Sequence, residues 1–453
     1  MLIRLVLLGL LCSGAPACQE DVARTVFDVR IVDGDNGNPV QGTDADTLRI
    51  VIQEGELDQQ LFEFPIVDGS FDAAIEFQAF VWPTRLRVEL SGSSDALLTA
   101  PPVFVPVNTR AFIRMVAAAP SSCERVAFNV MEARRAHFGM VLSGQFALLA
   151  GGTSAEAQLE FFDALEWDSN TNTLDDLNKD LDPFGETRAV SIDETQILVI
   201  PAEAAPFVFD MADANNRITP VVDLHTGAGP RSALVSVPGL RAAIVIGGEV
   251  EGAPQSGVTL VERDAEVTSL QLREPRSGPV AVAMGTDVLV VGGNQVGDAE
   301  ILVEGQSIGE LVTSLMDGVR EGGVLAGDGE SRALLLGGVD DADTLRQDTI
   351  EFTACPDACV QATGPTWSTA RQEVLLPEGS TLLIGGTDSR LVEEVRWPSG
   401  LVEIAPLLEL DTARAGAGAV VLESGAFVVA GGDDGVSSRN DFEFCVPAAL
   451  EPL

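Results

Sequence analysis

The sequence predicts an all-β protein in which a short N-terminal unit is followed by seven repeats of about 45 residues. Apolar and polar residues alternate with a period of two early in the chain, a Gly-Gly pair then recurs at regular intervals, and arginines recur ahead of these positions. Period-two alternation is typical of strands with one buried face. A fixed repeat of this length is typical of small sheets arranged side by side.

The first residues have the pattern of a signal peptide. Met1–Arg4 is a short positive start and Leu5–Leu11 is an apolar run too short to span a bilayer. Small residues then precede Cys18 and permit cleavage at that point. We therefore expect residues 1–17 to be removed and residues 18–23 to form a linker.

Cys18 resembles the acylated cysteine of bacterial lipoproteins, which implies export across the inner membrane and anchoring at the outer membrane or cell surface by a lipid. The chain has six cysteines, namely Cys12, Cys18, Cys123, Cys355, Cys359 and Cys445. Loss of Cys12 and acylation of Cys18 would leave four, enough for two disulfides, whereas plain secretion would leave five. We favour the lipoprotein, and free secretion stays open.

Residues 24–118 are expected to form a β-sandwich. Leu48, Ile50 and Ile52 alternate with polar neighbours, and several similar runs are separated by turn signals such as Asn36-Gly37. Six or seven short strands in this span resemble immunoglobulin-like or transthyretin-like modules by pattern.

The repeats are marked by apolar strands that end in Gly-Gly. The pairs stand at Gly151-Gly152, Gly247-Gly248, Gly292-Gly293, Gly337-Gly338, Gly385-Gly386 and Gly431-Gly432. The first interval is twice the others, and Ile197–Pro201 at its midpoint is a strand of the same kind without the glycines. An arginine precedes each strand end, at Arg135, Arg188, Arg231, Arg276, Arg320, Arg371 and Arg414. Seven such units indicate the blades of a β-propeller.

These repeats resemble those of the kelch family over residues 123–447. Ala133–Gly152 followed by Trp167, and Thr412–Gly432, carry the family's arginine, its apolar strand and its Gly-Gly pair. The resemblance implies a seven-bladed propeller, although this chain lacks the tyrosines and most of the tryptophans of the family pattern.

A propeller has to join its last blade to its first, because open sheet edges invite further strand pairing. We expect the strand Val126–Met131 to complete the last blade beside Phe442–Phe444. The cysteines stand at matching junctions, so the expected disulfides are Cys123–Cys445 and Cys355–Cys359.

Composition argues against several chemistries. A formal net charge of −42 disfavours binding to nucleic acid or anionic lipid. The kelch-like copper enzyme galactose oxidase needs tyrosine ligands, and this chain has no tyrosine, so copper-radical chemistry is excluded. Zinc is disfavoured, because the only two histidines, His137 and His225, are far apart in sequence and the cysteines are expected to form disulfides. Gly305–Gly309 has the spacing of a nucleophile elbow around Ser307, but it follows a strand in a Gly-rich repeat and is expected to be a chance match.

Two ligand classes stay open, and no cofactor is expected unless it is calcium. The acidic groups Asp33 with Asp35, Asp340-Asp341 with Asp343, and Asp433-Asp434 could bind calcium or could be solvated turns. We expect a non-catalytic surface protein whose propeller loops bind another protein. Carbohydrate binding is the alternative, with four scattered tryptophans against it, and a polysaccharide-active enzyme is a third possibility.

Overall fold

The protein is all-β throughout the part that the structure describes. The computed structural model describes residues 2–4 and 26–447 with gaps, of which 69–83 and 171–183 are the longest. Cys18 and most of the expected signal peptide lie outside the described residues. The helices of the described part are two single 3₁₀ turns, η1 (Pro238–Leu240) and η2 (Arg263–Ala265). Neither turn, nor any other described segment, is a helix long and apolar enough to cross a bilayer.

Two sheets with a shared core form the N-terminal part. One has the order β1 (Leu2–Arg4), β2 (Val26–Val32) and β7 (Arg110–Val116), with β2 and β7 parallel. The other is antiparallel, with the order β4 (Asp58–Pro65), β3 (Thr47–Glu54), β5 (Thr84–Ser91) and β6 (Ala96–Val105). The alternating residues of β3 and β5 turn their apolar side chains into a core that also holds Ile31 and Met115 of the first sheet.

Seven small antiparallel sheets follow in the described residues, and we number them 1 to 7. Sheets 1 and 2 contain β9 (Gly139–Ser143), β10 (Phe146–Ala150), β11 (Leu159–Asp163) and β12 (Asp168–Asn170), then β13 (Thr187–Ser191), β14 (Gln196–Pro201), β15 (Phe207–Asp210) and β16 (Ile218–Pro220). Sheet 3 contains β17 (Ala233–Val237), β18 (Ala242–Ile246), β19 (Glu249–Val250), β20 (Ala253–Val261) and β21 (Val267–Arg276). Sheet 4 contains β22 (Val280–Met284), β23 (Asp287–Val291), β24 (Asp298–Leu302) and β25 (Glu310–Ser314).

The last three sheets have the same hairpin order. Sheet 5 contains β26 (Val324–Gly327), β27 (Ala333–Leu336), β28 (Thr349–Thr353) and β29 (Val360–Thr363). Sheet 6 contains β30 (Gln372–Leu375), β31 (Thr381–Ile384), β32 (Leu391–Arg396) and β33 (Glu403–Glu409). Sheet 7 contains β34 (Gly418–Val421), β35 (Phe427–Ala430), β36 (Phe442–Val446) and, from far earlier in the chain, β8 (Ser122–Val126).

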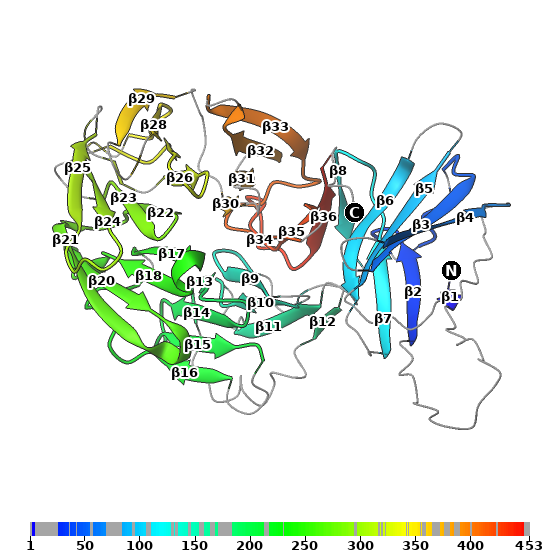
Figure 1. Ribbon diagram of the computed structural model, residues 1–453, viewed down its shortest axis with the longest axis horizontal. Coiled ribbons are helices and arrows are strands. Elements are labelled where there is room, and N and C mark those ends of the chain that lie inside the picture. The colour runs from blue at the N-terminus through cyan, green and yellow to red at the C-terminus, as the bar shows by residue number, and fades with distance from the viewer. Residues whose placement is uncertain are drawn as a thin grey trace.

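The first strands of these sheets contact one another in chain order. The contacts run from β9 to β13, β17, β22, β26, β30 and β34, and β34 then contacts β9. Figure 1 shows these strands on the inside of the arrangement and the last strands, such as β16, β25 and β33, on the outside. Apolar side chains fill the space between neighbouring sheets, as where Leu148 and Phe161 of sheet 1 pack with Ile197 and Phe209 of sheet 2.

The strand that completes sheet 7 lies earlier than its expected position at Val126–Met131. It is β8 (Ser122–Val126), which pairs antiparallel with β36. The register places Cys123 opposite Cys445, so Val126 falls opposite Phe442, the first residue of β36. Pairing therefore cannot continue past Val126, and the next residue, Ala127, instead donates its N–H to the carbonyl of Gly34 (2.8 Å).

Both expected disulfides are confirmed. Cys123 and Cys445 are bonded across the β8–β36 pair, with their Cα atoms 4.0 Å apart and a sequence separation of 322. Cys355 and Cys359 are bonded within the connection from β28 to β29. The first bond joins the start and the end of the seven-sheet region, and the second closes a local loop.

Candidate functional site

A buried arginine recurs at the end of four sheets where the first strand begins. Arg135, Arg276, Arg320 and Arg414 precede the first strands of sheets 1, 4, 5 and 7, and all four side chains are buried. Each donates Nη1 to the carbonyl oxygen of the first residue of a Gly-Gly pair. The distances are 2.7 Å to Gly151, 2.6 Å to Gly292, 2.8 Å to Gly337 and 2.7 Å to Gly431, in the same order.

Carboxylates at or near the third strand balance these buried charges. Arg135 pairs with Glu160 (2.9 Å), and Arg276 pairs with Asp298 (2.6 Å) and Glu300 (2.9 Å). In sheet 5, Arg320 pairs with Asp348 (2.7 Å), which is partly exposed. A buried guanidinium needs such partners, because an unpaired buried charge costs several kcal/mol. The recurring arginine thus belongs to the frame of each sheet.

The Gly-Gly pairs also tie neighbouring sheets together. The second glycine of a pair donates its N–H to the main-chain carbonyl at the arginine position of the next sheet, as Gly293 does to Arg320 (2.6 Å). Gly432 of sheet 7 donates in the same way to Arg135 of sheet 1 (2.7 Å). Gly431 has a φ of +59°, and a Cβ there would lie 2.5 Å from the Arg135 carbonyl oxygen. Glycine is therefore required at this contact between the last and first sheets.

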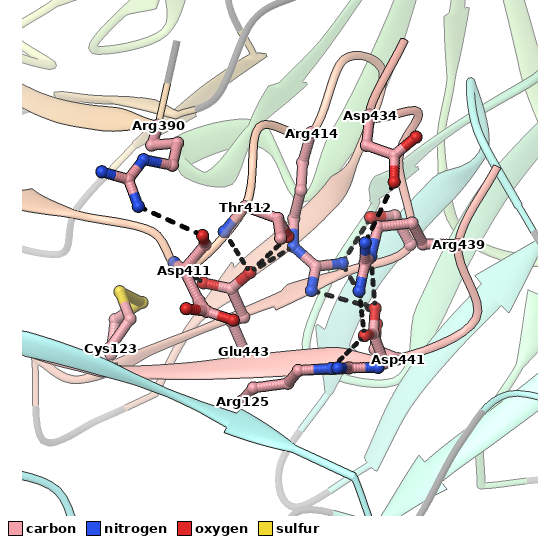
Figure 2. A network of polar contacts seen from close by, with 12 residues as sticks. Cys123, Arg125, Arg390, Asp411, Thr412, Arg414, Asp434, Arg439, Asp441 and Glu443 are labelled. Carbon is pink, nitrogen blue, oxygen red and sulfur yellow. Dashed lines mark hydrogen bonds and ion pairs between the residues drawn. A yellow bond between two sulfur atoms is a disulfide. The ribbon is translucent and has the colours of Figure 1, made fainter. Parts of the chain in front are cut away.

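Sheet 7 holds the most extensive of the described networks (Figure 2). Arg414 pairs with Glu443 (2.7 Å) and Asp441 (2.9 Å), and Asp441 also receives Arg439 (2.6 Å) and Arg125 of β8 (2.6 Å). Burial opposes the charge of Asp441, but the hydrogen bond from Arg439 and the Arg414 charge outweigh it and hold the Asp441 pKa well below its usual range. Asp441 is therefore ionised and joins two distant segments of the chain.

Two of the seven expected marker arginines do not occupy this position. Arg276 lies four residues before the first residue of β22, whereas Arg231 lies only two before Ala233 of β17, because the β17–β18 hairpin, which contains η1, is two residues longer than the β22–β23 hairpin. Arg231 is half-exposed and pairs with Glu249 (3.0 Å) and Glu321. Arg188 lies within β13, where it donates to the Ser232 carbonyl. Arg371 lies outside the described residues.

His225 takes the arginine's place in sheet 3. Its Nε2 bonds the Gly247 carbonyl oxygen (2.7 Å) and its Nδ1 bonds the Thr259 hydroxyl (2.9 Å), which stands where sheets 1, 4 and 7 have a glutamate. Gly257 makes room for the ring, since a Cβ there would lie 2.5 Å from it. Burial lowers the His225 pKa, with the Gly247 bond acting in the opposite direction. The neutral ring therefore supplies one donor and one acceptor.

A pocket of about 410 Å³ opens where the first strands of sheets 1, 2, 3 and 7 begin. Its polar side chains are His137, Glu186, Thr187 and Arg188, and glycine backbone lines much of the rest. His137 has a φ of +55° at a place where sheet 7 has Gly416 with +61°, and its ring packs on that glycine. The sequence pointed to His137 only as a solitary histidine. Its position beside Glu186 and Arg188 depends on sheet packing and has no local sequence signal.

The expected calcium groups lie in tight turns. Asp33 Oδ1 accepts the N–H groups of Asp35 (3.2 Å) and Gly37 (2.6 Å). Asp340 and Asp434 accept main-chain N–H groups two to four residues ahead in the same manner. No group of three or more possible metal ligands gathers among the described residues. Asp341 and Asp343 fall outside them.

Ser307 lies in a strand-to-strand connection, between β24 and β25, where its carbonyl accepts the Gln271 N–H (3.0 Å). The strand-to-helix turn that a nucleophile elbow requires is thus missing at this position. Of the four tryptophans, Trp397 is described, and it is partly buried against the core of sheets 5 and 6. Cys18 lies outside the described residues, so its acylation stays an expectation.

No protein-family model matches the chain, and no curated protein matches it. A solved structure of YjhT is similar, with a TM-score of 0.42 and 11% identity, over 69% of this chain and 95% of that chain.

Proposed function

We propose that this protein is a non-catalytic surface-binding protein built on a seven-bladed, kelch-like β-propeller. In this proposal residues 24–118 form a β-sandwich, residues 123–447 form the propeller, and a lipid on Cys18 holds the chain at the outer membrane or cell surface. The propeller loops bind a protein partner. Calcium is an optional ligand of the acidic turns, and nucleic acid is not a partner.

Support for the propeller comes from contacts between the ends of the seven-sheet region. The first strands contact one another in a series that returns from β34 to β9, and Gly432 bonds Arg135 across the same boundary. Sheet 7 is completed by β8, so the start of the region pairs with its end. Each feature is expected of a ring of blades, which leaves no sheet edge between the first and last blades.

The observation that carries the binding function is the exposure of apolar side chains on rigid loops. Val436 is 92% exposed and Leu345 is 49% exposed, each in a loop between the second and third strands of a sheet. Asp434 and Asp340 fix the turns of these loops by accepting main-chain hydrogen bonds. Because first and second strands are antiparallel, these loops stand at the same end of their sheets as the polar pocket beside His137.

Loops with fixed turns that present apolar residues at the same end as a polar pocket suit protein recognition, since little conformational entropy is lost on binding. The test is affinity capture from cell-surface extract with the full chain. We expect partners that bind wild type to be lost with Leu345→Asp combined with Val436→Asp. The matched control is Ile308→Asp combined with Leu401→Asp, which places the same charges at exposed sites on the opposite end. Equal capture by all three proteins would contradict the proposal.

Carbohydrate binding is the second candidate because one exposed aromatic ring has suitable surroundings. Phe146 is 40% exposed and contacts Phe161 (6.3 Å between ring centroids), over which the Arg217 guanidinium stacks at 5.3 Å. Sugar recognition commonly combines such a ring with polar neighbours. Glycan-array binding that disappears with Phe146→Ala and persists in the loop variant would favour this function over protein binding.

A further inference from the structure

The disulfide that joins β8 to β36 connects a partly buried residue to a fully buried one. Cys445 is fully buried, whereas Cys123 is only partly buried. Cys123 also lines an open pocket of about 540 Å³ between β8 and the last strand of sheet 6, β33. The Cys355–Cys359 bond has no such access, because both residues are buried and neither lines the pocket.

The pocket has walls suited to a small thiol or to a reactive loop of another protein. Leu407, Leu408 and Leu410 form an apolar side, and Leu407 packs in the same cluster as Cys123. Arg390 is the one cation among the lining residues, and it stands at an exposed rim where it pairs with Glu409 (3.0 Å). Figure 2 shows Arg390, Asp411 and Cys123 on the same side of sheet 7. A thiol entering here would meet the apolar side, the Arg390–Glu409 pair and Asp411, so access to Cys123, and not attraction by a net positive charge, favours exchange at this place.

We propose that Cys123–Cys445 is a site of thiol–disulfide exchange, attacked at Cys123 by a dithiol partner that enters this pocket. The partner thiolate bonds Cys123 Sγ, the Cys123–Cys445 bond breaks, and Cys445 leaves as a thiolate that takes a proton. The partner's second thiol, after losing its proton, displaces Cys123 as a thiolate, so the partner becomes a disulfide and two electrons pass to this protein. In the reverse reaction, the partner's disulfide oxidises Cys123 and Cys445 and forms the bond between them.

Access of the attacking thiolate determines which of the two disulfides is opened and which cysteine is attacked. Attack at Cys445 would require a nucleophile inside the core beside Phe427 and Val429, and attack at Cys355 or Cys359 would require opening the core of sheets 4 and 5. Exchange at Cys123 frees β8 from its covalent bond to β36, while the Arg414 network still holds β36 in sheet 7. The bond at this junction is therefore the one that a reductant opens in the folded protein.

The test is timed reduction of the oxidised full chain with glutathione or dithiothreitol, followed by alkylation and tryptic mapping. We expect Cys123–Cys445 to open at least about tenfold faster than Cys355–Cys359, because access controls the rate of exchange. We also expect the glutathione adduct on Cys123. Faster opening of Cys355–Cys359, equal rates, or an adduct on Cys445 would overturn the proposal.

A substitution in the pocket tests whether access to Cys123, and not the stability of the fold, controls the rate at which the disulfide opens. Leu407→Trp adds an indole beside Cys123 and should slow opening of Cys123–Cys445 several-fold, with Ile308→Trp, at an exposed site between β24 and β25, as the matched control. An unchanged rate in a folded Leu407→Trp protein would contradict entry through this pocket. If this variant does not fold, the position of the adduct in the wild type still decides the question.

Discussion

In sheets 3 and 7 a side chain bonds the carbonyl oxygen of the first glycine of the Gly-Gly pair, but the side chain differs. Sheet 3 is built from consecutive strands, and a neutral histidine bonds its Gly-Gly carbonyl. Sheet 7 takes β8 from more than 300 residues earlier, and it has a buried arginine network and a disulfide. Joining distant segments costs loop-closure entropy that a local hairpin does not incur. The comparison teaches that sheet 7 adds a disulfide and the Arg125–Asp441 pair where two distant segments of the chain have to be held together.

The largest effect is expected from removing the long-range disulfide. Replacing Cys123 and Cys445 together by serine should lower the free energy of unfolding by about 5 kcal/mol, since the bond restricts an unfolded loop of over 300 residues. The matched control replaces Cys355 and Cys359, whose separation of four residues predicts a loss of only about 2 kcal/mol. Urea unfolding monitored by tryptophan fluorescence measures both. A larger loss of unfolding free energy on replacing Cys355 and Cys359 would contradict this expectation.

The next effect concerns the buried arginine of sheet 7. Arg414→Met leaves Glu443 buried without its main partner and should cost about 3–5 kcal/mol in unfolding free energy. Adding Glu443→Leu removes the orphaned charge and should recover part of the loss. If Arg414→Met alone were neutral in chemical denaturation, the network would not secure this sheet.

His225 gives a smaller effect with a distinct pH dependence. Its folded-state pKa lies below the unfolded value of about 6.5, so the unfolded chain binds the proton more readily. Its contribution to stability is therefore complete above that pH and falls as pH is lowered through 6.5 toward the folded pKa. His225→Gln should cost about 1–3 kcal/mol at pH 7.5 by disturbing buried hydrogen bonds, and less at pH 5.5. Unfolding curves at both pH values measure this difference, and an equal cost at both would contradict the assignment.

Arg231 should give the smallest effect. Its side chain is 51% exposed, and exposed ion pairs contribute about 0–1 kcal/mol. We therefore expect Arg231→Met to change the free energy of unfolding by no more than about 1 kcal/mol, and raised salt to reduce even that. A loss as large as that of Arg414→Met would show that the sequence repeat, and not the distance to the first strand, decides which arginine matters.

The sequence predicted the all-β class because strand alternation is a local signal, and it predicted both disulfides because the cysteines stand at matching junctions of the repeats. It also marked the arginine and Gly-Gly positions without revealing that the side chain of one bonds the backbone of the other. It placed the start of the closing strand four residues too late, at Val126, although the predicted Cys123–Cys445 bond agrees with the observed register, in which Cys123 lies opposite Cys445. It also counted Arg231 among the marker arginines, because Arg231 has the usual spacing to Gly247. The longer β17–β18 hairpin, which contains η1, nevertheless places Arg231 nearer to the start of β17.

The pocket beside His137 and the pocket beside Cys123 lay beyond sequence reasoning for a common physical reason. Each is lined by residues from separate sheets, such as Glu186 with Gly416, or Cys123 with Leu407. No period or motif links such residues in one chain. Only the packing of the sheets brings them together.

The central claim is that the two ends of the seven-sheet region meet in sheet 7. Tryptic mapping of the oxidised chain without reductant tests it most directly, because Cys123 lies in the fragment 115–125, Cys445 in 440–453, and the other pair in 347–371. We predict that fragments 115–125 and 440–453 are recovered linked by a disulfide and that 347–371 carries an internal bond. Recovery of 115–125 linked to 347–371, or of Cys123 and Cys445 as free thiols, would contradict the account.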